Sequence, residues 1–250
     1  MDNQFILNPQ KFNKFINTLD RHVSDNPNKI REAYEYFKSA DADIKVAELL
    51  YNIKINSLAI FHLQQAAEKI LDGIGYMSGY ISLDEIKTSH HVTPNIYYKL
   101  IYRVLSAVLD MNEVEEEFSE KKEDAAKLPS EEIKEIITKC NGEDINTLII
   151  PVIQPNIPNF LKEARKRGRS NKLNFSKIRS WGKAFAIIVM ISRVLYPHEA
   201  YTRYPDNNIK PSDYNESKLG VAQNIEELIK LSKSSNDEVK SFINFLWQKK

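Results

Sequence analysis

The chain has 250 residues, enough for one large domain or two small ones, and a formal net charge of +1 that does not indicate a polyanion partner for the whole molecule. Its single cysteine, Cys140, excludes an intrachain disulfide, and no histidine near it in sequence points to a catalytic thiol. No apolar run reaches the roughly 18 residues of a membrane span, and the N-terminus lacks a signal-peptide pattern, so we expect a cytosolic protein with no membrane partner.

Residues 1–30 are predicted to be an N-terminal helical extension of a main body at 31–250. The seven glycines are few for this length, which favours helices over a loop-rich β fold. Asp25, Asn26 and Pro27 mark a turn that ends the extension. The extension is expected to carry one short helix that lies on the main body, with the apolar residues Phe5, Ile6, Leu7, Phe12, Phe15, Ile16 and Leu19.

Two long helices are predicted next, at about 28–51 and 56–76. Apolar residues recur three and four positions apart in the first, which is the helical period. Gly73, Gly75 and Gly79 crowd the end of the second, as expected of a C-terminal stop. Because the link between the two helices is very short, they should be antiparallel neighbours.

The second helix contains the stretch FHLQQAAEKIL, at 61–71, which places polar residues close to an apolar stripe. Residues three and four apart share a helix face, so Gln65, Glu68, Lys69 and Asp72 stack along one side. Buried polar groups require partners. Two interpretations remain open: a solvated polar face, or a hydrogen-bonded seam inside a helical bundle.

The rest of the chain also has a helical pattern. A loop is predicted at 77–95, followed by helices at about 94–108 and from Ser130 onward, whereas three prolines in 148–160 rule out a continuous helix there. A strongly apolar helix is predicted at 181–195, and a turn-rich stretch follows it at 196–213. Two more segments, 214–234 and 237–247, complete an all-α chain in which we find no strand pattern.

Three separated pieces of the chain carry a family pattern. They are YFKSADADIKVAELL at 36–50, LAIFHLQQAAEKIL at 58–71 with KTSHHV at 87–92, and YTRYPD at 201–206. Together they resemble the HEPN family (higher eukaryotes and prokaryotes nucleotide-binding), in the subset that contains an RYPD motif. The resemblance covers about 32–108 and 181–235, and the segment between them, about 109–180, looks like an insertion.

The resemblance implies an antiparallel up-and-down bundle of four or five core helices, often a homodimer packed through helix faces. Some family members are metal-independent ribonucleases of toxin–antitoxin and other defence systems. Others bind nucleotides or act as non-catalytic partners of nucleotidyltransferases. We therefore expect a nucleotide- or RNA-binding protein of a defence or toxin–antitoxin type, and the ribonuclease and the non-catalytic partner are kept as alternatives. No cofactor is expected.

Arg193 and His198 are the candidate catalytic pair. Family ribonucleases use an arginine and a histidine separated by four to six residues, which a dimer brings into one cleft, and this pair has that spacing. The histidine would transfer the proton of a ribose 2′-hydroxyl, and the arginine would stabilise the developing negative charge. Pro197 and Val194 depart from the motif, so a helix-end arginine and a turn histidine are the alternative. Burial of either residue against its own bundle would exclude the catalytic role.

Arg203, within TRYPD, matches the family better than Arg193, yet no histidine follows it within six residues. It is expected either to pair with a carboxylate such as Glu68 or Asp206, or to bind a phosphate together with Gln65 and Lys69. Asp72 stands where the family often has a further lysine, which removes one positive charge from such a site.

The segment at 162–183 is strongly basic, whereas 110–124 is acidic and could cover it. His90 and His91 lack the spacing of metal ligands, so no metal is expected. Phe175 or Trp181 could stack on a base beside the basic residues. The candidate nucleic-acid contacts, which would neutralise phosphates, are Arg165, Lys166, Arg167, Arg169 and Lys172.

Overall fold

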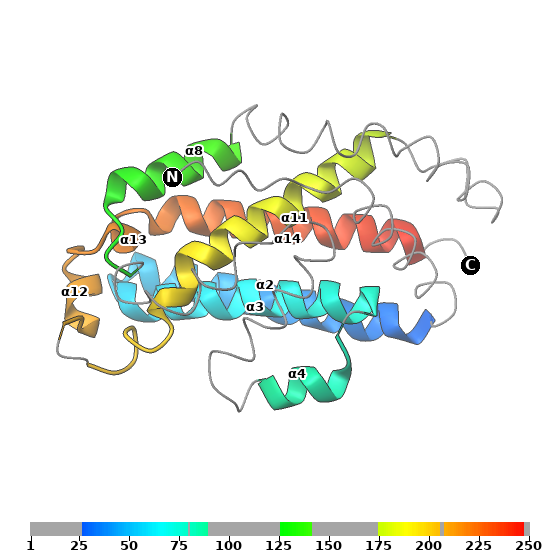
Figure 1. Cartoon of the computed structure of the whole chain (residues 1–250), viewed down its shortest axis with the longest axis horizontal. Helices are drawn as coiled ribbons and strands as arrows, with labels where there is room; N and C mark the ends of the chain where they lie inside the picture. Colours follow the sequence, from blue (N-terminus) through cyan, green and yellow to red (C-terminus); the bar gives the residue numbers. More distant parts are fainter. Residues whose placement is uncertain (1–26, 80, 90–125, 142–174, 206–207, 248–250) are drawn as a thin grey trace, which may run out of the picture.

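The structure is a computed structural model that describes residues 27–79, 81–89, 126–141, 175–205 and 208–247. All regular elements within these ranges are helical, so the predicted all-α bundle is confirmed. Figure 1 shows two helices lying side by side, a third beside them and a fourth crossing obliquely. These four are α2 (Pro27–Asn52), α3 (Asn56–Ser78), α14 (Ile225–Trp247) and α11 (Phe175–Leu195).

The first two helices form the predicted antiparallel pair. A tight link joins them, in which Lys54 has a left-handed φ of 64° and the N–H of Ile55 donates to the carbonyl of Leu50 at 2.9 Å. Gly79 ends α3 with a φ of 76°, which only glycine adopts at little cost, so the predicted glycine stop is confirmed. The predicted bounds of both helices agree with the structure to within two residues.

The core lies where the four long helices meet. The ring of Trp181 from α11 stacks on Phe242 of α14, with centroids 5.0 Å apart. Gly73 lets α3 approach α2 closely, because a Cβ there would lie 2.7 Å from Cζ of Phe37. Asn236 of α14 then ties α14 to α2 by donating to the carbonyl of Phe37 at 3.0 Å.

The last third of the chain differs from its prediction. Instead of helices at 214–234 and 237–247, the structure has α12 (Pro211–Asn215), α13 (Gly220–Gln223) and one continuous α14. Asn224 marks the break before α14, where its side chain donates to Oγ of Ser130 at 2.9 Å and to the carbonyl of Gly220 at 2.8 Å. Ser234 does not interrupt α14, because its hydroxyl bonds back to the carbonyl of Leu231.

Other elements agree only in part. The predicted loop at 77–95 contains a short helix, α4 (Leu83–Ser89). The helix predicted from Ser130 is present as α8 (Ser130–Asn141), and α11 begins six residues before the predicted Trp181. Residues 1–26 of the extension predicted at 1–30, the helix predicted at 94–108 and most of the proposed insertion lie outside the described residues, whereas residues 27–30 belong to α2.

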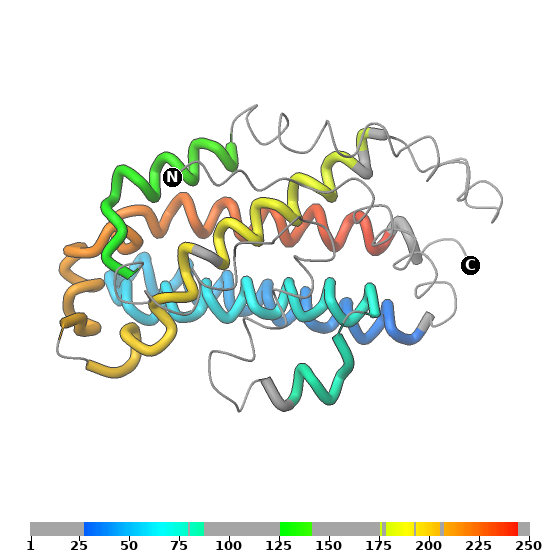
Figure 2. Tube along the Cα trace, in the orientation of Figure 1, coloured from blue at the N-terminus to red at the C-terminus, as the bar shows by residue number. Residues whose placement is uncertain are grey.

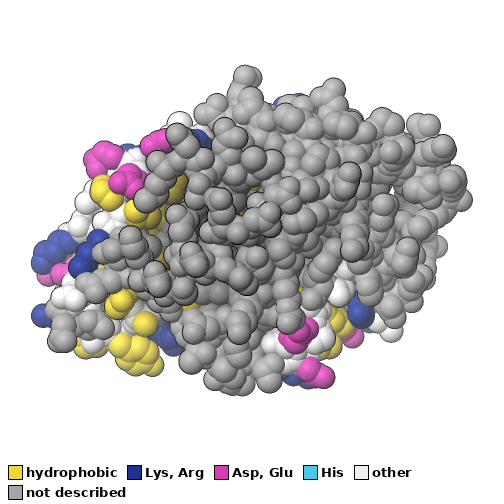
Figure 3. Space-filling model, in the orientation of Figure 1, with side chains coloured by type: hydrophobic (Ala, Val, Ile, Leu, Met, Phe, Trp, Pro, Cys, Tyr) yellow, Lys and Arg dark blue, Asp and Glu magenta, His cyan; other side chains and the backbone are white. Residues whose placement is uncertain are grey.

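One end of the bundle gathers several chain segments. Figure 2 shows the α2–α3 link, the end of α11, α12 and α13 together at the left. Asn56 at the start of α3 donates to the carbonyl of Tyr214 in α12 at 3.2 Å, across 158 positions of sequence. Basic and acidic side chains are mixed at this end (Figure 3), where Lys218 lies 2.6 Å from Glu216. None of the described helices has the length and apolar character that crossing a membrane requires.

Candidate functional site

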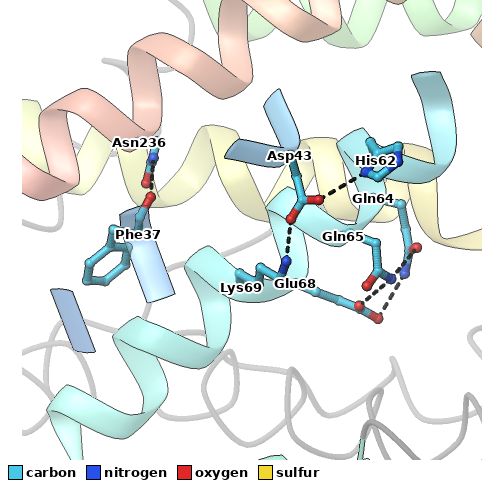
Figure 4. A network of polar contacts seen from close by, with 8 residues as sticks. All are labelled: Phe37, Asp43, His62, Gln64, Gln65, Glu68, Lys69 and Asn236. Atoms are coloured by element: carbon cyan, nitrogen blue, oxygen red, sulfur yellow. Dashed lines mark hydrogen bonds and ion pairs between the residues drawn. The ribbon is translucent and has the colours of Figure 1, made fainter. Parts of the chain in front are cut away.

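The polar side of α3 contains a buried hydrogen-bonded group, shown in Figure 4. Nε2 of Gln64 donates to Oε1 of Glu68, and Nε2 of Gln65 donates to Oε2 of the same carboxyl group, both at 2.8 Å. Glu68 is buried, whereas Gln65 is half-buried and reaches the edge of the cluster. The sequence allowed two interpretations of these polar residues, a solvated face or a hydrogen-bonded seam inside the bundle. The structure shows the hydrogen-bonded seam.

This seam holds protons more tightly than ordinary carboxyl groups do. Burial raises the pKa of Glu68 to about 8, with further contributions from Glu199 and Asp72, while the two amide hydrogen bonds act in the opposite direction. Burial likewise raises the pKa of Asp72 to about 7. Glu68 is therefore mainly uncharged at neutral pH, which makes it a poor partner for a cation.

A second cluster joins α2 to α3 beside the seam. Nδ1 of His62 lies 2.9 Å from Oδ1 of Asp43, and the ammonium group of Lys69 contacts the other oxygen of that carboxylate (Figure 4). Asp43 is buried, whereas His62 and Lys69 are partly exposed, with the side chain of Lys69 26% exposed. Asp43 thus orients the imidazole and neutralises the lysine, so an anion must compete with Asp43 for Lys69.

Arg203 lies over the beginning of the same helix. The 3₁₀ helix η1 (Tyr196–His198) follows α11 and leads into the turn that contains TRYPD. There the guanidinium carbon of Arg203 lies 4.7 Å from the ring centroid of Phe61 and 5.3 Å from that of Tyr204. Its Nη2 lies 3.7 Å from Oε1 of Glu199. The expected carboxylate partner was Glu68 or Asp206. The carboxylate beside Arg203 is that of Glu199 and not that of Glu68, which two amides bond, and Asp206 lies outside the described residues.

The three residues predicted to bind phosphate are spread along one side of α3. Phe61, Gln65 and Lys69 are four positions apart in turn and so share one side of α3. Arg203 stacks at the Phe61 end, and Lys69 stands about 12 Å further along the axis at 1.5 Å per residue. We call these residues, with Tyr204, the α3 polar face. It is two helical turns long and has a cation at each end.

His198, by contrast, points into the protein. Its side chain is 1% exposed, and Nδ1 lies 2.9 Å from the hydroxyl oxygen of Tyr214. Burial lowers its pKa to about 3, so the imidazole is neutral at any physiological pH. The prediction that His198 acts in proton transfer is therefore corrected: it is closed off from a substrate within this chain. Arg193 lies in α11, and its side chain is not among those described.

Most of the other sequence candidates lie outside the described residues. His90, His91 and the five basic candidates at 165–172 lie outside the described residues. Burial raises the pKa of the Cys140 thiol to about 11, as expected of an unreactive cysteine. Within the described ranges, no three His, Cys, Asp or Glu side chains gather in a way that could hold a metal ion.

Sequence reasoning missed four residues of this region: Asp43, His62, Glu199 and Tyr204. Asp43 had a usable signal, because it lies between Ala40 and Ala47 on the buried stripe of α2, where an acidic residue needs a partner. Nothing in the sequence predicts that the ring of Tyr204 lies against the guanidinium of its neighbour Arg203.

Comparison of the chain with family models, with curated proteins and with solved structures finds no match.

Proposed function

We propose that this chain is a HEPN-like protein that binds a nucleotide or RNA on the α3 polar face, and that it serves in a cytosolic defence or toxin–antitoxin system, as a homodimer. The supporting observation is that Arg203 stacks on Phe61, which shares one side of α3 with Gln65 and Lys69, although Arg203 is far from them in sequence. The all-helical bundle agrees with the fold that the family resemblance implies.

The chemistry of this face suits a ligand that combines phosphate with uncharged polar groups. Lys69 and Arg203 offer positive charge, and Arg203 offers a planar set of donors that matches phosphate oxygens. Gln65 lies between Phe61 and Lys69 along the helix, and its half-buried amide nitrogen donates to Gln64 and Glu68. Because Glu68 is mainly uncharged at neutral pH, it adds little repulsion against an anion at this place.

Binding measurements test the proposal directly. Fluorescence anisotropy of a labelled oligouridine at low salt should show clear affinity that falls about fivefold or more in Lys69→Ala and in Arg203→Ala, since each loses a phosphate contact. Lys230→Ala is the matched control, because Lys230 is exposed on α14 and pairs only with Glu226 among the contacts described there. Equal losses in all three variants would reduce the effect to net charge and contradict the assigned face.

The basic residues predicted to contact nucleic acid require a separate test. Neutralising Arg165, Arg167 and Arg169 together should flatten the dependence of log affinity on log salt, by about 0.7 per lost phosphate contact on a single strand. An unchanged slope would remove this segment from the proposed nucleic-acid interface and leave the α3 polar face alone.

The non-catalytic partner remains a second candidate, favoured by one observation. Leu49 and Ile53 are each 65% exposed at the end of α2, and Leu58 is 38% exposed beside them. Apolar side chains that gather at one end can serve in association with a second copy or with a nucleotidyltransferase. If the homodimer uses this end, Leu49→Ser with Ile53→Ser should convert it to a monomer in sedimentation experiments. The ribonuclease alternative through Arg193 and His198 is disfavoured by the burial of His198.

A further inference from the structure

Tyr204 exposes an aromatic ring beside the cation at one end of the α3 polar face. It is 63% exposed, and it is the one aromatic residue among the large hydrophobic side chains that are exposed in the described part of the chain. The guanidinium of Arg203 covers one side of the ring at 5.3 Å from its centroid. Most of the remaining ring surface is therefore open to solvent.

The turn that carries Tyr204 has a hydrogen-bonded backbone without any ligand. The N–H groups of Arg203 and Tyr204 both donate to the carbonyl of Ala200, at 3.1 and 2.9 Å. Thr202 is buried. Its N–H donates to the backbone carbonyl of His198, and its hydroxyl group donates to the backbone carbonyl of Glu199. A ligand that stacks on Tyr204 would therefore pay little for ordering the turn.

Arg203 is held in place and still has donors to offer. Phe61 packs on one part of the guanidinium, which fixes its plane, and the contact to Glu199 is long, at 3.7 Å. A guanidinium has five N–H donors, and one long contact to one carboxylate oxygen uses few of them. An anion can therefore bind at the edge of the same group whose faces contact the rings.

We infer that Tyr204 is a stacking platform for an unpaired nucleobase and that Arg203 binds the phosphate attached to that nucleoside. This inference rests on the proposed function and deepens it. The ligand class is a nucleotide unit, either free or within a single strand, and not phosphate alone. Since every base presents a π face, stacking of this kind favours bases over baseless ligands without reading a sequence.

Three ligands and three substitutions test the inference. The ligands are uridine monophosphate, an oligouridine and ribose 5-phosphate, which carries the phosphate without the base. Uridine monophosphate should bind about tenfold more tightly than ribose 5-phosphate, an advantage typical of one stacked base. Tyr204→Leu should abolish that advantage, whereas Tyr204→Phe and Tyr204→Trp should keep it. The chain already has two tryptophans, so Tyr204→Trp should add to their emission a component that the uridine ligands quench and ribose 5-phosphate does not.

A matched control and the opposing outcomes complete the design. Tyr34→Leu removes another tyrosine with a cation over its ring at 5.3 Å, from Lys38, and should leave the base preference unchanged. Equal binding of uridine monophosphate and ribose 5-phosphate would overturn the inference but leave a phosphate site. Binding of none of the ligands would overturn the proposed function as well. Binding of the oligouridine that free uridine monophosphate cannot displace would identify the strand as the ligand.

Discussion

The imidazole of His198 and the phenol of Tyr214 meet edge to face inside the bundle, with ring centroids 5.5 Å apart and planes at 85°. They share a hydrogen bond between Nδ1 and the hydroxyl group. Tyr214→Phe should lower the free energy of unfolding by about 1–3 kcal/mol, because it leaves a buried polar group without its partner.

His198→Gln should likewise lower stability and leave ligand binding by the folded fraction unchanged. Urea denaturation and anisotropy measure the two quantities. RNA cleavage by the wild type that His198→Gln abolishes, with folding intact, would restore the catalytic interpretation.

Asp43 competes with any anion for Lys69, so its removal should strengthen binding. In Asp43→Asn, the affinity for oligouridine should rise at low salt, because Lys69 is released from its carboxylate. Stability should fall by about 1–3 kcal/mol, because the buried carboxylate of Asp43 bonds both His62 and Lys69. Asp41→Asn is the matched control on the same helix, since Asp41 pairs with Lys240 instead. If both substitutions raise affinity equally, the gain reflects net charge only.

Glu68 predicts a specific pH dependence of stability. Between its ordinary pKa of 4.5 and its folded pKa of about 8, the folded chain holds a proton that the unfolded chain has lost. The free energy of unfolding contributed by this group therefore falls as pH rises through that window, by up to about 1.4 kcal/mol per pH unit. Glu68→Gln lacks this proton, so its melting temperature should fall less than that of the wild type between about pH 5.5 and about pH 8. Parallel melting curves for the two proteins would contradict the raised pKa.

Gly73 should not tolerate a methyl group. Replacing glycine by alanine inside a helix usually stabilises it by up to about 1 kcal/mol. At this position the new Cβ would lie 2.7 Å from Cζ of Phe37 and 3.2 Å from Cβ of Tyr36. Gly73→Ala should therefore destabilise the bundle by about 1–3 kcal/mol in urea denaturation. Adding Phe37→Leu should recover part of the loss, and a stabilised Gly73→Ala would mean that α2 and α3 are further apart than described.

The sequence predicted the helices well where the apolar period is long and uninterrupted, as in α2 and α3. It failed around Asn224 and Ser234, because serines and asparagines are common both at helix ends and, when they bond back to the backbone, within helices. Asn224 precedes α14 with its side chain bonded both to Gly220 and to Ser130, and the second of these contacts is a tertiary one that local pattern cannot predict.

The residues of the candidate site that lie on α3 could be predicted from the sequence, whereas their contacts with other segments could not. The spacing of Gln65, Glu68 and Lys69 placed them together, since a helix has a fixed period. That Lys69 pairs with Asp43, and that Arg203 stacks on Phe61, depends on how segments distant in sequence pack, and local pattern carries no information on that. For His198, the local pattern predicted a role that the packing excludes. Its spacing from Arg193 fits a catalytic motif, but it is buried against Tyr214.

The hydrogen bond from Asn56 to the carbonyl of Tyr214 closes a loop of 158 positions. Closure entropy grows only with the logarithm of loop length, and doubling such a loop costs about 0.6 kcal/mol. A longer or shorter connection between α3 and α8 should therefore change the stability of the bundle little. The α8 helix itself is constrained, because Oγ of Ser130 accepts a hydrogen bond from Asn224 and Ile133 lies in the core.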